Sequence, residues 1–222
     1  GLFAIGECNF SDHGANRLGA SALMQGLADG YFVLPYTIQN YLADQITVPR
    51  FSTELPEFAE AEKNVQDLIN RLMNIKGKKS VDSIHKELGH VMWEYVGMGR
   101  TEEGLKIGLQ KLKEIRKDFE NNLFIPGTTE GVNIELEKAL RLNDFITMGE
   151  LIAYDALNRN ESCGGHFREE YQTEEGEAKR DDENFFYVAC WEYQGSDDKA
   201  PVLYKEPLVY EAIKVQTRNY KS

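Results

Sequence analysis

The chain has 222 residues and a mass of 25.3 kDa, which is enough for one large domain or two modest ones. Apolar residues make up 41% and charged residues 28% of the chain, and this composition excludes a disordered or fibrous protein. A formal net charge of -12 opposes general binding to nucleic acid or to anionic lipid surfaces.

The chain begins with a short apolar run over residues 2–5, which is typical of a buried strand that Gly6 ends. Since the first residue is not Met and the strand is already under way, we expect the chain to be a piece of a larger protein. A loop rich in turn formers over residues 9–16 leads into a helical pattern that starts at Arg17. Pro35 is expected to end or kink this helix before further helical turns over residues 36–45.

Beyond a boundary at residues 50–56, the apolar residues recur at steps of three and four, which predicts amphipathic helices. Ser80 and Thr101 stand at two of the predicted helix starts, where their side chains suit N-caps, and a further helix is predicted from Asn133 to about Asn158. Short connections between such helices predict a helix bundle. The apolar stripes run over residues 58–72, 81–95, 105–119 and 136–156.

The last part of the chain has a different pattern. Residues 158–184 are dense in charge and glycine and indicate a structured loop. Alternating apolar residues then predict a strand over 185–193, a turn over 194–198 and a returning strand over 201–204. This order predicts a hairpin near the end of the sequence.

One segment has the character of a binding site. Glu7 follows the predicted strand, and Arg17 opens the helix after a Gly-rich loop. The start of a helix favours an anion or a polar carbonyl group, and a guanidinium suits a carboxylate. From spacing alone, an ordinary structural turn is the competing interpretation.

The other reactive residue types suggest no second site. The three cysteines, Cys8, Cys163 and Cys190, are too widely spaced for a metal-binding motif, so we expect no metal. No apolar run reaches the roughly 18 residues that a bilayer span requires, so we expect no direct membrane insertion. The histidines are expected to face solvent or to be satisfied by neighbours.

Two segments, residues 1–8 and 13–19, lie around the predicted site. Together they closely resemble the signature of the flavoprotein subunit of succinate dehydrogenases and fumarate reductases. The resemblance continues, in the same order, over residues 84–89, 96–97, 103–105, 112–116, 161–168 and 180–184.

The resemblance implies a mainly α fold, in which the last strand and helix of an FAD-binding domain precede a spectrin-like three-helix bundle and a C-terminal extended segment with a hairpin. The corresponding domains are 1–50, 51–160 and 161–222. Relatives of this kind have further FAD-binding and capping segments toward the N-terminus. We therefore expect this chain to be a C-terminal fragment that does not bind FAD or turn over substrate alone.

The resemblance also implies site residues. Arg17 matches the arginine that holds a substrate carboxylate beside the flavin, and Glu7 matches the acid that binds the ribityl hydroxyls of FAD. Ala22 and Leu23 match the pair whose backbone N–H groups face the flavin pyrimidine carbonyl. Ser21 begins the sequence Ser-Ala-Leu, where the family commonly has Asn-Ser-Leu.

The implied activity is hydride transfer between succinate or fumarate and FAD. Electrons would pass to an iron-sulfur subunit and, through a membrane-anchored cytochrome b subunit, to quinone, at the cytoplasmic face of the inner membrane. Such a protein serves electron transport in the tricarboxylic acid cycle or in anaerobic respiration. Two alternatives stay open, an L-aspartate oxidase-like flavoprotein and a non-catalytic helical interaction domain. The oxidases usually have Met-Ala-Ser where this chain has Leu-Gly-Ala at 18–20.

Overall fold

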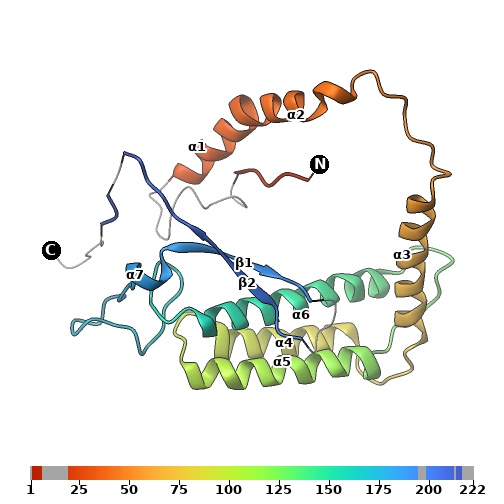
Figure 1. The fold of residues 1–222 in the computed structure, drawn as a ribbon. Helices are drawn as coiled ribbons and strands as arrows, with labels where there is room; N and C mark the ends of the chain where they lie inside the picture. The colour runs from red at the N-terminus through yellow and green to blue at the C-terminus, as the bar shows by residue number, and fades with distance from the viewer. Residues whose placement is uncertain (1, 7–19, 195–198, 213, 217–222) are drawn as a thin grey trace. The chain divides into compact units, whose positions relative to one another are not determined.

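A computed structural model describes residues 2–6, 20–194, 199–212 and 214–216 (Figure 1). The chain forms two compact units, of which one is Leu42–Arg159 and the other combines Gly1–Tyr41 with Asn160–Ser222. The division into domains 1–50, 51–160 and 161–222 stays a prediction.

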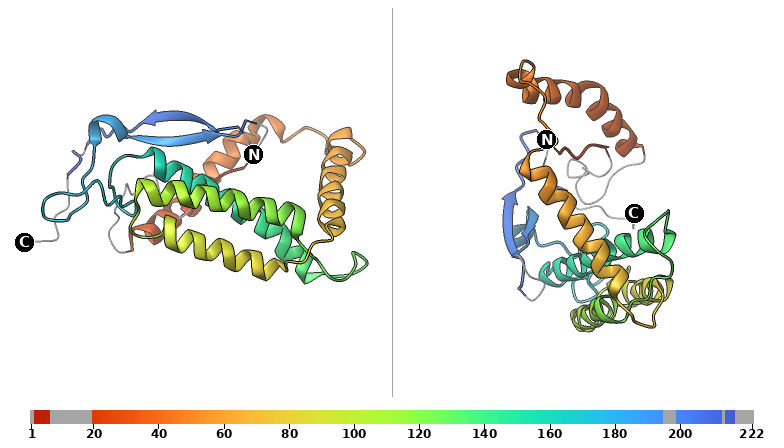
Figure 2. Two further views of the ribbon diagram at one scale, coloured as in Figure 1. Left: turned by 90° about the horizontal axis from the view of Figure 1, so that it is seen from below. Right: turned by 90° about the vertical axis from the view of Figure 1, so that its right-hand side faces the viewer.

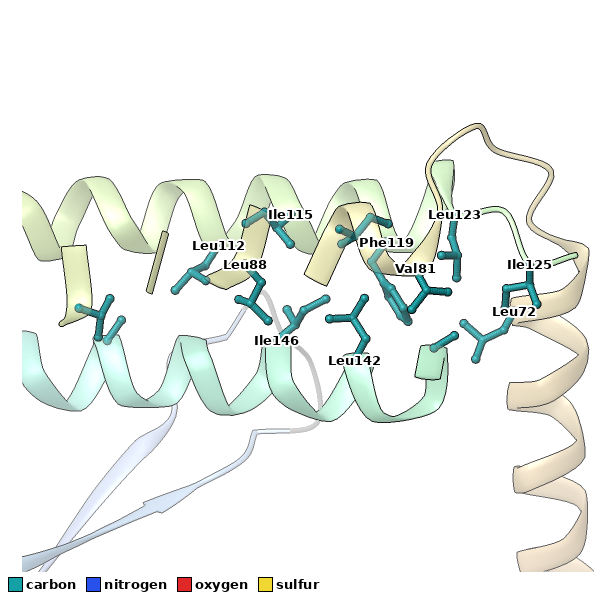
Figure 3. Close-up of a cluster of buried hydrophobic side chains, with 14 of the residues drawn as sticks. Leu72, Val81, Leu88, Leu112, Ile115, Phe119, Leu123, Ile125, Leu142 and Ile146 are labelled. Carbon is teal, nitrogen blue, oxygen red and sulfur yellow. The ribbon is translucent and has the colours of Figure 1, made fainter. Parts of the chain in front are cut away.

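Three long helices of the first unit pack against one another as a bundle. They are α4 (Val81–Val96), α5 (Glu102–Asn122) and α6 (Ile134–Asn158). Their apolar stripes meet in one core, where Leu88, Leu112 and Ile146 point toward a shared interior (Figure 3). This arrangement confirms the predicted mainly α fold and the three-helix bundle.

A side chain caps the start of each bundle helix, and two of these N-caps, Ser80 and Thr101, are the ones that the sequence predicts. The side-chain oxygens of Ser80, Thr101 and Asn133 each accept a hydrogen bond from the backbone N–H three residues later. These bonds satisfy donors that have no acceptor within the helix, so the starts of the helices are fixed locally.

Helix α3 (Pro56–Asn74) lies across the end of the bundle (Figures 1 and 2). Only Leu72, near its end, is buried, whereas Phe58 and Val65 on the predicted stripe are about half exposed. The helix is therefore confirmed, but its first half does not pack along the others.

The beginning of the chain is helical over most of its described length. Helix α1 (Ser21–Ala28) continues as a π-helix, η2 (Asp29–Val33), then as α2 (Leu34–Leu42) and a 3₁₀ turn, η3 (Ala43–Gln45).

Pro35 lies in the first turn of α2 and does not end the helix, so the helical stretch is longer than the pattern suggested. Proline has no backbone N–H, so one hydrogen bond of the helix is missing at this position. The π-helical turn η2, directly before α2, is a local change in the backbone hydrogen-bonding pattern.

The predicted strand over residues 2–5 is wrong. These residues are irregular, and Leu2 is 99% exposed. A strand requires a neighbour that pairs with it, and the two-stranded sheet of the described residues is formed elsewhere in the chain.

The last part of the chain contains the predicted hairpin. After a short helix, α7 (Asp182–Phe185), strand β1 (Tyr187–Glu192) pairs antiparallel with β2 (Val202–Pro207). Most of the expected turn, residues 195–198, lies outside the described residues.

The loop before the hairpin is ordered by buried polar groups. Ser162 is fully buried and bonds through Oγ to the backbone N–H and carbonyl of Arg168, which is itself 1% exposed. Glu161 accepts a hydrogen bond from the backbone N–H of Asp181 at 2.8 Å. The predicted structured loop is thereby confirmed.

Candidate functional site

The first turn of α1 is the part of the predicted site that the structure describes. Ala20, before the helix, has a left-handed backbone with φ 65°, and no side chain caps the helix start among the described residues. Met24 donates its backbone N–H to the carbonyl of Ala20 at 3.1 Å, the first bond of the helical ladder.

The three predicted cofactor contacts, Ser21, Ala22 and Leu23, form this turn. Ala22 is buried at 7% exposure, whereas Leu23 is 74% exposed. Backbone N–H groups of a first turn have no acceptor within the helix and lie at its positive end. This geometry, with small side chains at 20–22, fits a carbonyl group that carries developing negative charge.

Glu7 and Arg17 lie outside the described residues, as do Cys8 and the loop that carries His13. Their proposed roles stay predictions. The structure does describe what holds the chain on either side of them, at Gly6 and at Ala20.

The segment before Glu7 packs closely against α1 and η2. Gly6 donates its backbone N–H to Oδ2 of Asp29 at 3.0 Å. A Cβ placed on Gly6 would lie 3.7 Å from the Cα of Gly26, at ordinary van der Waals distance from the helix backbone. At the other end of the segment, the ring of Phe3 meets that of Tyr41 edge to face, with centroids 5.8 Å apart.

Asp29 was not predicted from the sequence. The Gly6–Asp29 bond joins residues 23 positions apart, and no local pattern signals such a pair. The only available sign was an acidic residue inside an otherwise apolar helical stretch.

The helical stretch that carries this site exposes apolar side chains on several faces. A helix that is apolar all round is typical of one that other parts of a protein bury. The exposed residues include Leu23, Met24, Leu27, Tyr31, Phe32 and Tyr36.

Among the residues that the structure describes, the histidines and cysteines do not converge on a second site. The ring of His85 stacks near that of Phe145 at 5.5 Å, and His166 forms a backbone bridge with Cys163. Within the described residues, no three His, Cys, Asp or Glu side chains are grouped so as to hold a metal ion. None of the described helices has both the length and the apolar character needed to cross a membrane.

The main electrostatic feature of the bundle is a lysine between two acids. The ammonium of Lys79 donates to Asp118 at 2.6 Å and to Glu87 at 2.8 Å. These hydrogen bonds, that of Asp118 first, raise the pKa of Lys79 above its ordinary 10.5. Lys79 therefore joins α4 and α5 and has no part in the candidate site.

Comparison with known proteins gives a consistent result. The family model described as fumarate reductase flavoprotein C-term matches residues 85–220. The fumarate reductase flavoprotein subunit of Proteus vulgaris is 34% identical over 190 residues, which cover 83% of this chain and 29% of that protein. The succinate dehydrogenase flavoprotein subunit of Bacillus subtilis is 29% identical over 171 residues, which cover 77% of this chain and 29% of that protein.

Solved structures agree with the sequence comparison. A quinol-fumarate reductase with menaquinol molecules has 27% sequence identity and a TM-score of 0.77, and the alignment covers 96% of this chain and 35% of that one. The chain thus spans about a third or less of the length of the relatives it matches.

Proposed function

Since this chain belongs to the family of fumarate reductase flavoprotein C-terminal regions, we propose that it is part of a flavoprotein subunit that interconverts succinate and fumarate. The family match over residues 85–220 is the observation that carries this proposal. FAD is the cofactor of the proposed subunit and, when bound, supplies the chemistry of hydride exchange with the dicarboxylate.

The chain's own residues would bind and orient the reactants. Arg17 would hold one carboxylate of the substrate by a charge-assisted, two-pronged hydrogen bond. Glu7 would accept hydrogen bonds from the ribityl hydroxyls of FAD. The backbone N–H groups of Ala22 and Leu23 would meet the pyrimidine carbonyl, where the positive end of α1 stabilises negative charge.

The exposed apolar helix supports a larger subunit. Leu23, Leu27 and Phe32 are each more than half exposed. In the proposed subunit, the FAD-binding segments that the relatives carry before the matched region would cover them. Burial of large apolar side chains contributes roughly 1.5–3 kcal/mol each, so this contact would be a strong one.

The proposed subunit would pass electrons to an iron-sulfur subunit and then, through a membrane-anchored cytochrome b subunit, to quinone. It would lie at the cytoplasmic face of the inner membrane and be held there by those partners. The negative charge of the chain fits a peripheral position, because anionic lipid repels it.

Dicarboxylate binding tests the role of Arg17 in the full-length subunit. We expect a bound flavin spectrum that malonate or fumarate perturbs, and we expect Arg17→Ala to abolish the perturbation while the flavin stays bound. Arg50→Ala, which removes an exposed arginine, is the matched control and should leave the perturbation unchanged. A normal malonate response in Arg17→Ala would refute the assignment.

The two alternatives give different results in the same material. An L-aspartate oxidase would reduce its flavin with L-aspartate in place of succinate, and the relatives reported above do not favour it. A non-catalytic helical domain would give a colourless full-length protein that releases no flavin on denaturation.

A further inference from the structure

We propose that Asp29 is a positioning residue for the flavin site. Its carboxylate holds the Leu2–Gly6 segment in register against α1, the helix whose first turn is proposed to meet the flavin. This inference rests on the proposed function and adds to it a residue that does not itself touch cofactor or substrate.

The hydrogen bond from Gly6 to Asp29 fixes one end of the segment. The N–H of Gly6 reaches Oδ2 of Asp29 at 3.0 Å in a partly buried position. Hydrogen bonds to a charged acceptor are stronger than hydrogen bonds between neutral groups. This bond therefore fixes the position of Gly6 beside the helical stretch.

The backbone conformation of Gly6 suits this bond. Gly6 has φ +68°, in the left-handed region that side chains disfavour, and a Cβ on it would lie 3.7 Å from the Cα of Gly26, at ordinary van der Waals distance. A larger residue at position 6 would therefore strain the backbone at the residue that donates to Asp29. The contact of Phe3 with Tyr41 then fixes the direction in which the segment runs along α2.

Asp29 and the proposed flavin contacts lie on one continuous helical stretch. Asp29 directly follows the eight residues of α1 that begin with Ser21, so it lies about 12 Å along the axis from the first turn. The bond therefore holds Gly6 at a set distance from the proposed pyrimidine contact. Glu7, the proposed ribityl contact, is the next residue after Gly6 in the chain. A shift in the position of Gly6 would therefore also shift Glu7.

FAD titration of the full-length subunit tests the inference. Wild type and variants would be produced in flavin-depleted cells and titrated with FAD, with quenching of flavin fluorescence as the readout. Asp29→Ala removes the acceptor and should weaken FAD binding roughly tenfold. Asp29→Asn keeps an acceptor oxygen but removes the charge, and it should restore most of the FAD affinity. If only the negative charge of Asp29 mattered, Asp29→Asn would bind FAD as weakly as Asp29→Ala. Asp44→Ala, at an exposed acid of η3, is the control.

Hydrogen exchange at the Gly6 amide gives a readout that needs no flavin. We expect this amide to exchange faster in Asp29→Ala than in wild type and to be protected again in Asp29→Asn. Equal FAD affinity in wild type and Asp29→Ala, or equally weak binding by both Asp29 variants, would overturn the inference. Failure of the wild-type subunit to bind FAD would instead overturn the proposed function.

Discussion

At the scale of single residues, two glycines of the bundle unit differ in the space around them. A Cβ on Gly77 would lie 1.9 Å from the backbone carbonyl of Asn122, whereas a Cβ on Gly89 in α4 would meet nothing within 4 Å. Gly77 also donates its backbone N–H to the carbonyl of Leu123 at 3.0 Å. The clash therefore cannot be relieved without breaking this bridge, the hydrogen bond between residues 77 and 123.

We therefore predict opposite effects of the same substitution. Gly77→Ala should lower the free energy of unfolding by about 3 kcal/mol, because two backbones would have to separate. Gly89→Ala should raise it by about 0.8 kcal/mol, since alanine is the better helix former. Urea unfolding of the two variants beside wild type measures both values, and similar effects would contradict this description of the bridge.

Lys79 makes the stability of the bundle depend on alkaline pH. Because Asp118 and Glu87 raise its pKa in the folded protein, the stabilisation is complete below 10.5 and is lost as the pH rises through the raised value. The difference in free energy of unfolding between wild type and Lys79→Met should thus be constant near neutral pH and shrink above pH 10.5.

Unfolding measured along a pH series checks this expectation. Lys86→Met removes an exposed lysine of α4 and serves as the control, for which the difference from wild type should not change in the same way. A Lys79→Met deficit that grows above pH 10.5 would show that the sign is wrong.

At the scale of elements, an ion pair joins α5 to α6. Arg116 reaches both carboxylate oxygens of Glu150 through Nε at 3.0 Å and donates to Thr147 at 3.1 Å. The two charged side chains are only 12% and 22% exposed. The pair Arg141–Glu137 on α6 is more than half exposed at both side chains.

This difference in burial predicts a difference in stability. Arg116→Ala should cost about 2 kcal/mol, because Glu150 would be left partly buried without its partner. Arg141→Ala should leave the free energy of unfolding unchanged within error, since water screens an exposed pair. Thermal and urea unfolding of both variants measure this contrast, and equal losses would be inconsistent with it.

The bundle helices were predictable because their signals are local. The apolar spacing lies within each helix, and the N-caps Ser80, Thr101 and Asn133 lie directly before the helices that they start. The strand predicted over residues 2–5 failed for the opposite reason, since strand formation depends on a distant partner. The same limit hid the bond from Gly6 to Asp29, which crosses 23 positions, and the pair Arg116–Glu150, which crosses 34.

At the scale of the whole molecule, the helical stretch α1–α2 has apolar surface that the described residues leave open. Leu27 is 52% exposed and Phe32 is 71% exposed. We predict that the 222-residue chain alone self-associates through this surface. The double variant Leu27→Glu with Phe32→Glu should be monomeric by light scattering, whereas Trp93→Glu, at an exposed aromatic of α4, should still associate.

The sequence pattern located the candidate site, but the roles of its residues could be predicted only through the resemblance. A glycine-rich loop before a helix is common, so Glu7 and Arg17 acquire their proposed roles from the family pattern and not from spacing. The structure adds the frame around them, formed by Gly6, Asp29 and the first turn of α1. Neither the sequence pattern nor the resemblance identified the bond between Gly6 and Asp29.

Anaerobic titration of the full-length subunit with succinate tests the central claim most directly. We predict that succinate bleaches the bound flavin absorption, that fumarate restores it, and that Arg17→Ala prevents both changes while it retains flavin. A subunit that holds no flavin, or a bound flavin that succinate leaves oxidised, would contradict the account.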